Sequence, residues 1–272
     1  MFVYNIADLC VFQRVALITG AGGSIGRAVA LGFARHGVTG IAGLDVSSKG
    51  LQGTASALSA VYPAVKFLPI TADLTSESAV ANAVSQVVAE FGAIHYAANN
   101  AGIGRPFGPT HETDTKDYDC VMEVNVKGVW LCEKYELEQM LKQEPRQVNP
   151  SVPGVLERGS IVVTASTLGL RAMSNLSVYN MSKHAVLGLT RTDAIDYGRK
   201  GVRVNAVCPG FVDTPLLLES TKQALASTID RIPQGRLAMP EEVADSVCFL
   251  ASGLASHIIG VALPVDGGFV VT

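Results

Sequence analysis

Apolar and polar positions along the chain form two patterns that follow each other regularly from Arg14 onward. Short uninterrupted apolar runs are typical of strands buried on both faces of a sheet, whereas apolar positions three and four residues apart indicate amphipathic helices. The apolar runs predict strands at Val15–Thr19, Gly40–Asp45, Val65–Thr71, Ala93–Ala98, Ser160–Ala165, Val202–Val207 and Ile258–Val265. The helical spacing predicts helices at Ile25–Arg35, Ser48–Ala60, Glu77–Phe91, Lys116–Gln143, Val178–Arg199 and Glu241–Leu250. Strands that alternate with helices in this way predict a parallel, doubly wound sheet with right-handed crossovers.

One strand and the helix after it carry candidate chemistry. Ser166 directly follows the predicted strand Ser160–Ala165, at the edge of the sheet where open α/β folds bind ligands. Ser177 is a predicted N-cap, and Tyr179 and Lys183 lie four positions apart in the first two turns, so they share one face of the helix. A nearby ammonium lowers the pKa of a phenol from about 10, which suits the phenol to proton exchange with an alcohol or carbonyl oxygen. Ser166 is positioned to hold the same oxygen by a hydrogen bond.

The Tyr-x-x-x-Lys spacing occurs twice, so the spacing alone does not identify a site. Tyr62 and Lys66 also have it, but Pro63 follows that tyrosine, which indicates a loop that leads into a strand. We interpret this second pair as surface residues.

A glycine-rich turn after the first strand predicts a nucleotide site. The segment TGAGGSIG has glycines at Gly20, Gly22, Gly23 and Gly26, where backbone amides and the start of a helix can meet a pyrophosphate. A tight corner without a ligand is the alternative. Asp45 ends the second strand about 20 residues further on, where a carboxylate accepts from a ribose 2′-hydroxyl and repels a 2′-phosphate. Its alternative role is to cap the next helix, and because no arginine or lysine stands directly beside it, we predict NAD rather than NADP.

Two further strand ends hold polar or small residues. Asp73 ends the third strand and is either an N-cap or an adenine contact, which its spacing does not decide. The fourth strand runs into the segment 97–104, AANNAGIG, whose small residues allow close approach to a cofactor and whose asparagines order either the loops or an Asx-type turn.

Length and composition indicate one α/β domain over residues 1–272. Hydrophobic residues make up 48% of the chain, and the net charge of −3 with a pI near 6.0 provides no basic surface for nucleic acid. The cysteines are Cys10, Cys120, Cys132, Cys208 and Cys248, an odd number without a Cys-x-x-Cys, which favours reduced core thiols and neither a metal nor a disulfide framework. No stretch approaches the about 20 apolar residues of a membrane span, so we expect a soluble cytoplasmic protein.

Together these motifs resemble the short-chain dehydrogenase/reductase family from Arg14 to Phe269. The matching pieces are TGAGGSIG, Asp45, Asp73-Leu74, Asn100-Ala101-Gly102, Asn125 in MEVNVKG, Ser166 in TASTLG, Tyr179 and Lys183 in YNMSK, Pro209-Gly210 in NAVCPGFVDTP, and Asp266-Gly267-Gly268. The resemblance implies a single-domain Rossmann-type sheet of seven parallel strands in the order 3-2-1-4-5-6-7. The segment from Asn180 to Leu216 resembles fungal members, some of which act on secondary metabolites.

The resemblance also implies roles for individual residues. The catalytic set would be Asn125, Ser166, Tyr179 and Lys183, with Tyr179 as general acid/base, Lys183 as pKa modifier and ribose ligand, and Asn125 supporting a proton-relay water. The cofactor-binding set would be Gly20, Gly22, Ser24, Ile25, Gly26, Asp45, Asp73, Leu74, Asn100, Ala101, Gly102, Tyr179, Lys183, Pro209, Gly210, Val212 and Thr214. In this set Asp73 and Leu74 would meet the adenine, and Val212 and Thr214 the nicotinamide carboxamide.

Two features depart from the family pattern. Ser24 replaces the middle glycine of T-G-x-x-x-G-x-G, with Gly23 just before it, so the two residues look exchanged locally. The segment Lys142–Arg158 is longer than usual, and its prolines and polar residues predict an exposed surface loop, with a role in partner or substrate contacts as the alternative.

In this family the segment at about 211–236 covers the substrate. Leu170, Met173, Phe211, Leu216 and Leu217 are candidate substrate contacts that would favour an apolar alcohol or ketone, although the same residues could equally be core. The expected function is an NAD(H)-dependent oxidoreductase, an alcohol dehydrogenase/ketoreductase that interconverts a secondary alcohol and a ketone on an apolar or alicyclic small molecule. A non-catalytic NAD(H) sensor or scaffold is the alternative. The resemblance further implies a homo-oligomer, a tetramer or dimer, and no metal.

Overall fold

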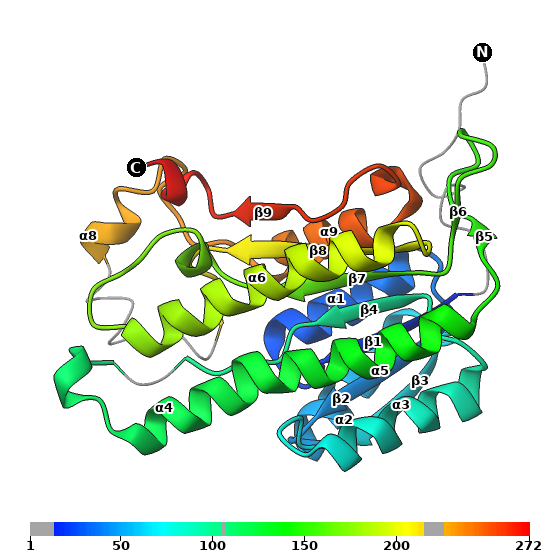
Figure 1. Cartoon of the computed structure of the whole chain (residues 1–272), viewed down its shortest axis with the longest axis horizontal. Coiled ribbons are helices and arrows are strands. Elements are labelled where there is room, and N and C mark those ends of the chain that lie inside the picture. Colours follow the sequence, from blue (N-terminus) through cyan, green and yellow to red (C-terminus); the bar gives the residue numbers. More distant parts are fainter. Residues whose placement is uncertain (1–13, 105–106, 215–225) are drawn as a thin grey trace.

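A parallel sheet of seven strands forms the centre of the molecule (Figure 1). The computed structural model describes residues 14–104, 107–214 and 226–272. The strand order is β3-β2-β1-β4-β7-β8-β9, which confirms the predicted doubly wound sheet. The strands are β1 (Val15–Thr19), β2 (Gly40–Asp45), β3 (Lys66–Thr71), β4 (Tyr96–Asn99), β7 (Gly159–Thr164), β8 (Val202–Pro209) and β9 (Ala262–Val265). Because β1 pairs in parallel with both β2 and β4, the carboxyl ends of these strands meet at one edge.

Helices cover both faces of the sheet and each face has its own core. One core packs α3 (Glu77–Phe91), α5 (Val129–Lys142) and α6 (Ser177–Gly198) against the sheet. The other packs α1 (Ser24–Arg35), α2 (Ser48–Val61) and α9 (Pro240–Ala251). A four-residue helix, α8 (Ala226–Ile229), precedes α9, and short 3₁₀ turns are η2 (Thr110–Glu112), η4 (Thr167–Gly169), η5 (Gly253–Ala255) and η6 (Phe269–Val271). Among the described residues, no helix has both the length and the apolar content that a membrane span requires.

The predicted single helix Lys116–Gln143 is interrupted. The chain forms α4 (Thr115–Met122), a π-helical turn η3 (Glu123–Gly128) and then α5. The apolar spacing is continuous through this region, so it does not show the widened turn. The turn surrounds the fully buried Asn125, whose tertiary hydrogen bonds favour the local change of winding.

The segment Lys142–Arg158 is not simply an exposed loop, contrary to the prediction. It contains the antiparallel strands β5 (Arg146–Gln147) and β6 (Leu156–Glu157), which lie at the end of the molecule away from the carboxyl ends of the sheet (Figure 1). Val148 is buried, and Asn149 Nδ2 donates to the carbonyl of Gly253 over 3.1 Å. The loop that joins the two strands is therefore anchored to the core.

Candidate active site

The carboxyl edge of the sheet gathers most of the predicted site residues. The glycine turn follows β1, the loop 100–102 follows β4, and Ser166 follows β7. The helix α6 begins beside this edge and brings Tyr179 and Lys183 to it. It starts at Ser177 with Leu176 in the cap position, one residue earlier than the predicted cap.

Ser166, Tyr179 and Lys183 form one group. Ser166 Oγ accepts from the backbone N–H of Leu168 over 3.1 Å, which sets the turn η4 after the strand. Burial raises the pKa of the Tyr179 phenol, and a hydrogen bond with the Ser166 side chain opposes that shift. Lys183 is 5% exposed and its Nζ lies 5.6 Å from the centre of the Tyr179 ring. A tyrosine, a serine hydroxyl and an ammonium thus meet where a substrate oxygen could bind.

The direction of the tyrosine shift differs from the prediction. The sequence predicts that a neighbouring ammonium lowers the phenol pKa, but Lys183 Nζ donates to the carbonyl of Thr164 over 3.0 Å and is itself buried. Burial lowers the pKa of Lys183 to about 8. Since desolvation disfavours both charged forms, the structure holds Tyr179 as a neutral phenol.

Asn125 links this group to the loop after β4. Its Oδ1 accepts from the Ile103 N–H over 2.8 Å, and its Nδ2 donates to the Ile103 carbonyl over 2.9 Å and to Ser182 Oγ over 3.2 Å. A Cβ added to Gly102 would lie 3.3 Å from Asn125 Oδ1 and 3.5 Å from Lys183 Nζ. The structure therefore places the four predicted catalytic residues around one end of α6.

The glycine turn has serine at position 24 and glycines where its backbone is most restricted. Gly20 adopts φ +66°, and a Cβ on Gly26 would lie 2.1 Å from the Gly20 carbonyl oxygen, so neither position tolerates a side chain without rearrangement. Ser24 begins α1, with Gly23 in the cap position and no side chain bonded to the first-turn amides. These amides remain available for an anion at the helix N-terminus.

Asp45 organises the turn and does not cap the next helix. Its Oδ2 accepts from the Gly22 N–H over 2.9 Å and its Oδ1 from the Ser47 N–H over 2.8 Å. Ser47 is the N-cap of α2, because its Oγ accepts from the Gly50 N–H over 3.0 Å. The carboxylate is partly exposed beside the glycine turn, which fits the predicted ribose position.

Asp73 is not a helix cap either. Its Oδ1 accepts from the backbone and the hydroxyl of Thr75 over 2.9 and 2.8 Å, whereas Ser76 caps α3. The Asp73 side chain is exposed, but the Leu74 side chain belongs to the core, so only the main chain of Leu74 is free to meet an adenine.

The segment after β8 adds the last predicted residues. Pro209 ends β8, and a Cβ on Gly210 would lie 2.8 Å from the Asp266 Cβ, so glycine allows this close approach. Val212 forms an isolated bridge with Ala238, which fixes the main chain two residues before Thr214.

The candidate substrate residues are only partly placed together. Leu170, Met173 and Phe211 are each half-buried. Phe211 packs edge-on against the buried Phe269, with ring centres 5.1 Å apart, a contact that sequence reasoning missed. Arg171 packs against the same ring, because its guanidinium lies 4.4 Å from the Phe269 ring centre and donates to the Phe269 carbonyl over 2.7 Å. Leu216 and Leu217 lie outside the described residues.

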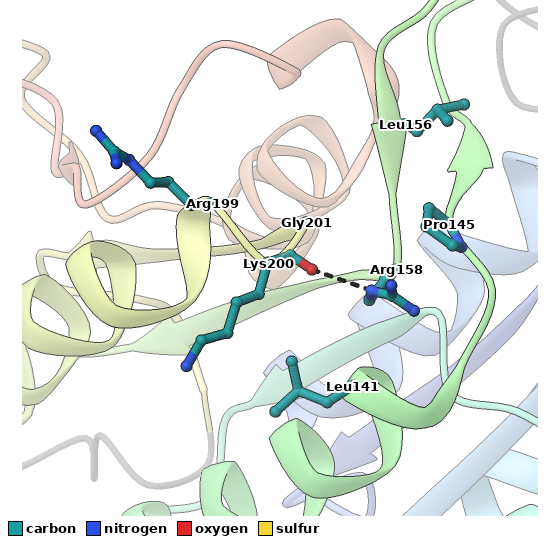
Figure 2. Close-up of a pocket in the computed structure, with 7 residues that line it drawn as sticks. All are labelled: Leu141, Pro145, Leu156, Arg158, Arg199, Lys200 and Gly201. Atoms are coloured by element: carbon teal, nitrogen blue, oxygen red, sulfur yellow. Dashed lines mark hydrogen bonds between the residues drawn. The ribbon is translucent and has the colours of Figure 1, made fainter.

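The hollow shown in Figure 2 lies away from this group, below the strands β5 and β6. Its lining comprises Leu141, Pro145, Leu156, Arg158, Arg199, Lys200 and Gly201. Arg158 Nε donates to the Lys200 carbonyl over 3.1 Å, while the Arg199 side chain points away from the hollow (Figure 2). The cationic groups do not converge on one point, so the hollow provides no catalytic arrangement.

The chain belongs to the short-chain dehydrogenase/reductase family. Residues 20–270 match the family model described as enoyl-(acyl carrier protein) reductase. The chain is similar to short-chain dehydrogenase fogB of Aspergillus ruber, at 39% identity with 94% of this chain and 97% of the relative covered. It is also similar to cis-4-hydroxycyclohexanecarboxylate dehydrogenase of Sinomonas cyclohexanicum, at 39% identity with 94% and 96% covered.

Solved structures share the whole fold. The crystal structure of levodione reductase superposes with a TM-score of 0.88 at 34% identity, covering 96% of this chain and 100% of that one. Other similar structures were determined with NAD+ bound, as in xylitol dehydrogenase, or with NADP at low occupancy.

Proposed function

We propose that the protein is an NAD(H)-dependent oxidoreductase that interconverts a secondary alcohol and a ketone. The observation that carries this proposal is the meeting of Tyr179, Ser166 and Lys183 at the carboxyl edge of the sheet. In a family of oxidoreductases, this group supplies the proton and the oxygen-binding hydroxyl that alcohol–ketone chemistry requires.

The residues around the glycine turn fit a nicotinamide dinucleotide. The uncapped amides at the start of α1 would hold the pyrophosphate, Asp45 the adenosine ribose, and Lys183 the nicotinamide ribose. The loop 100–102 and the segment from Pro209 to Thr214 would flank the cofactor. When bound, the cofactor exchanges a hydride with the substrate carbon.

The chain's own groups handle the proton. In the direction of reduction, the neutral Tyr179 phenol donates its proton to the carbonyl oxygen while the Ser166 hydroxyl donates a hydrogen bond to the same oxygen. In the direction of oxidation, the Tyr179 phenolate accepts the hydroxyl proton, and the Lys183 ammonium stabilises that phenolate. Burial raises the pKa of the Tyr179 phenol, so the free protein keeps this side chain neutral and able to donate its proton.

For the substrate we propose an apolar or alicyclic small molecule. Phe211 and Leu170 are only half-buried and so keep some apolar surface exposed, and one relative is named for a hydroxycyclohexane acid. A place in secondary metabolism is part of the proposal and rests on the resemblance of the segment from Asn180 to Leu216 to fungal members of the family. We further propose a homo-oligomer in the cytoplasm, with a substrate-covering segment at about 211–236, of which residues 215–225 are outside the described part of the chain.

The experiment that tests the function is a titration with NADH and NADPH followed by a panel of alicyclic alcohols and ketones. We expect tight NADH binding and turnover of at least one panel member.

Tyr179→Phe should lower kcat by about 10² to 10⁴-fold, since it removes the general acid/base, while NADH binding stays unchanged. Tyr62→Phe is the matched control, because it alters the other Tyr-x-x-x-Lys pair, and it should retain full turnover. Full activity of Tyr179→Phe would overturn the assignment, and NADH binding without turnover across the panel would favour the sensor alternative.

A further inference from the structure

Two polar side chains meet in the core beneath the loop 100–102. Asn99, the last residue of β4, is 1% exposed, and Glu136 of α5 is 0% exposed. Asn99 Nδ2 donates to Glu136 Oε2 over 2.8 Å. The other oxygen of each group, Asn99 Oδ1 and Glu136 Oε1, has no hydrogen-bond partner among the described residues.

An ionised Glu136 does not account for this pattern. A carboxylate only accepts hydrogen bonds, so it would leave Asn99 Oδ1 without a donor and would bury an unpaired charge. A protonated carboxyl carries one O–H donor. The two unpartnered atoms are an acceptor and the oxygen that would hold this proton, and the bond from Asn99 Nδ2 to Glu136 Oε2 brings the two groups side by side, so a single proton on Oε1 would satisfy both.

The surroundings of Glu136 favour the neutral form. Burial raises the pKa of Glu136 to about 7, and the hydrogen bond from Asn99 opposes that rise. The ionisable neighbours on α5 are Cys132 and Glu133, and Glu133 faces Asp193 of α6. The elements α3, β4, β7 and β8 also pack against α5, and in the described part of the chain none of them offers a cation that shifts the Glu136 pKa.

We propose that Glu136 is a positioning residue that carries a proton on Oε1 in the folded protein and donates it to Asn99 Oδ1. Carboxylic acid and amide then form a planar pair joined by two hydrogen bonds. The pair fixes the point at which β4 ends. The next two residues, Asn100 and Ala101, donate their N–H groups to Thr19 Oγ1 over 3.0 and 3.1 Å, so the pair determines where the loop 100–102 begins. Only the importance of this loop for the cofactor rests on the proposed function.

Two substitutions test whether Glu136 carries a proton or a negative charge in the folded protein. Glu136→Gln keeps the shape and supplies an N–H at the position of the proposed O–H, so it should retain both hydrogen bonds and lose only the titration. Glu136→Met keeps a similar volume but leaves both polar atoms of the Asn99 amide unpaired. We expect the glutamine variant to fold with a Tm close to that of the wild type at acidic pH, and the methionine variant to have a lower Tm at every pH.

The pH dependence has a defined sign. The folded protein would hold a proton up to a pH of about 7 that the unfolded chain releases near about 4.3, so this group's stabilisation is full at low pH and is lost as pH rises towards 7. Because His95 and Glu133 also titrate, the readout is the difference in Tm between wild type and Glu136→Gln. That difference should be smallest at pH 5 and grow towards pH 8, where the wild type becomes less stable than Glu136→Gln because only its side chain can ionise.

Infrared difference spectroscopy observes the proton directly. The wild-type spectrum minus that of Glu136→Gln should contain a carboxylic C=O band at pH 6 that disappears at pH 9. The proposal is overturned if this band is absent at pH 6, or if Glu136→Gln loses as much stability as Glu136→Met.

Cofactor titration tests the positioning role separately. Glu136→Gln should bind NADH like the wild type, whereas Glu136→Met should bind it several-fold more weakly. Equal binding by all three proteins would remove the positioning role. Absence of NADH binding by the wild type would instead contradict the proposed function, and the infrared and Tm results would still decide whether Glu136 carries the proton.

Discussion

Single residues at the carboxyl edge combine a structural bond with an exposed functional group. Asp45 holds the glycine turn through Gly22 and its own loop through Ser47, yet part of its carboxylate stays exposed. Sequence spacing predicted the position of Asp45 but left helix capping open. The structure decides against capping because Ser47, two residues later, has the side-chain geometry of the N-cap.

Substitution of Asp45 should change the preference between the two cofactors. Asp45→Asn removes the charge that repels a 2′-phosphate and weakens the acceptor for a ribose hydroxyl. A hydrogen bond to a charged group contributes about 1.5–3 kcal/mol, so the preference for NADH over NADPH should fall by about tenfold or more. Fluorescence titrations with both cofactors measure it.

The ratio of the two dissociation constants is the decisive quantity in this experiment. The Asp45→Asn variant would also hold the Gly22 amide less firmly, which would weaken both cofactors alike and leave the ratio unchanged. Glu138→Gln, on the exposed side of α5, is the control and should leave both affinities unchanged. An unchanged ratio for Asp45→Asn would show that Asp45 is only a structural residue of the turn.

At the scale of elements, the periodic parts of the chain were predictable and the tertiary exceptions were not. The bounds of α3 and of β1 and β2 coincide with the predicted ones, because their apolar spacing and caps lie within the segment itself. The turn η3 and the strands β5 and β6 depend on contacts with residues distant in the sequence. The spacing of apolar positions within a segment gives no information on such contacts. For the same reason Glu133 and Glu136 look like the polar face of a surface helix in the sequence, although both are buried.

One buried cation joins three of these elements. Arg203 of β8 donates to Glu157 of β6 over 2.8 Å, and its other nitrogens donate to the carbonyls of Leu250, Ala251 and Ser252 at the end of α9. Arg203 thereby joins the pair of strands β5 and β6 to the sheet and caps the carboxyl end of α9. The side chains of Arg203 and Glu157 are 6% and 8% exposed, so water does not replace either partner.

Arg203→Met should therefore be strongly destabilising. It leaves the Glu157 charge buried without a partner, and breaking a buried pair in this way costs about 3–5 kcal/mol. Denaturant unfolding of the purified protein measures the loss. Arg203→Met combined with Glu157→Met should recover part of it, because no buried charge remains. Lys142→Gln breaks an exposed ion pair and should cause no measurable change. Equal losses for the single and the double variant would show that the helix cap, and not the ion pair, provides the stability.

At the scale of the whole molecule, two helices present apolar residues that nothing in the described chain covers. Trp130 on α5 and Met181 and Ile195 on α6 are 47%, 44% and 80% exposed. Met181 and Ile195 are separated by nearly a whole number of helical turns, so they lie on one face, and α5 and α6 run side by side (Figure 1). Isolated exposed apolar side chains are ordinary, but because these three lie on two adjacent helices we infer that this row is an interaction surface.

The proposed homo-oligomer would bury this row against a second copy. Size-exclusion chromatography with light scattering should then show an assembly for the wild type and a smaller species for Ile195→Lys, because a charge buried at the interface without a partner opposes association. Val61→Lys is the matched control, since Val61 is 62% exposed but lies at the end of α2, which belongs to the opposite face of the sheet. A monomeric wild type would contradict the oligomer. An assembly that Ile195→Lys leaves intact would place the interface on another face, and the exposed row on α5 and α6 would then need a different partner.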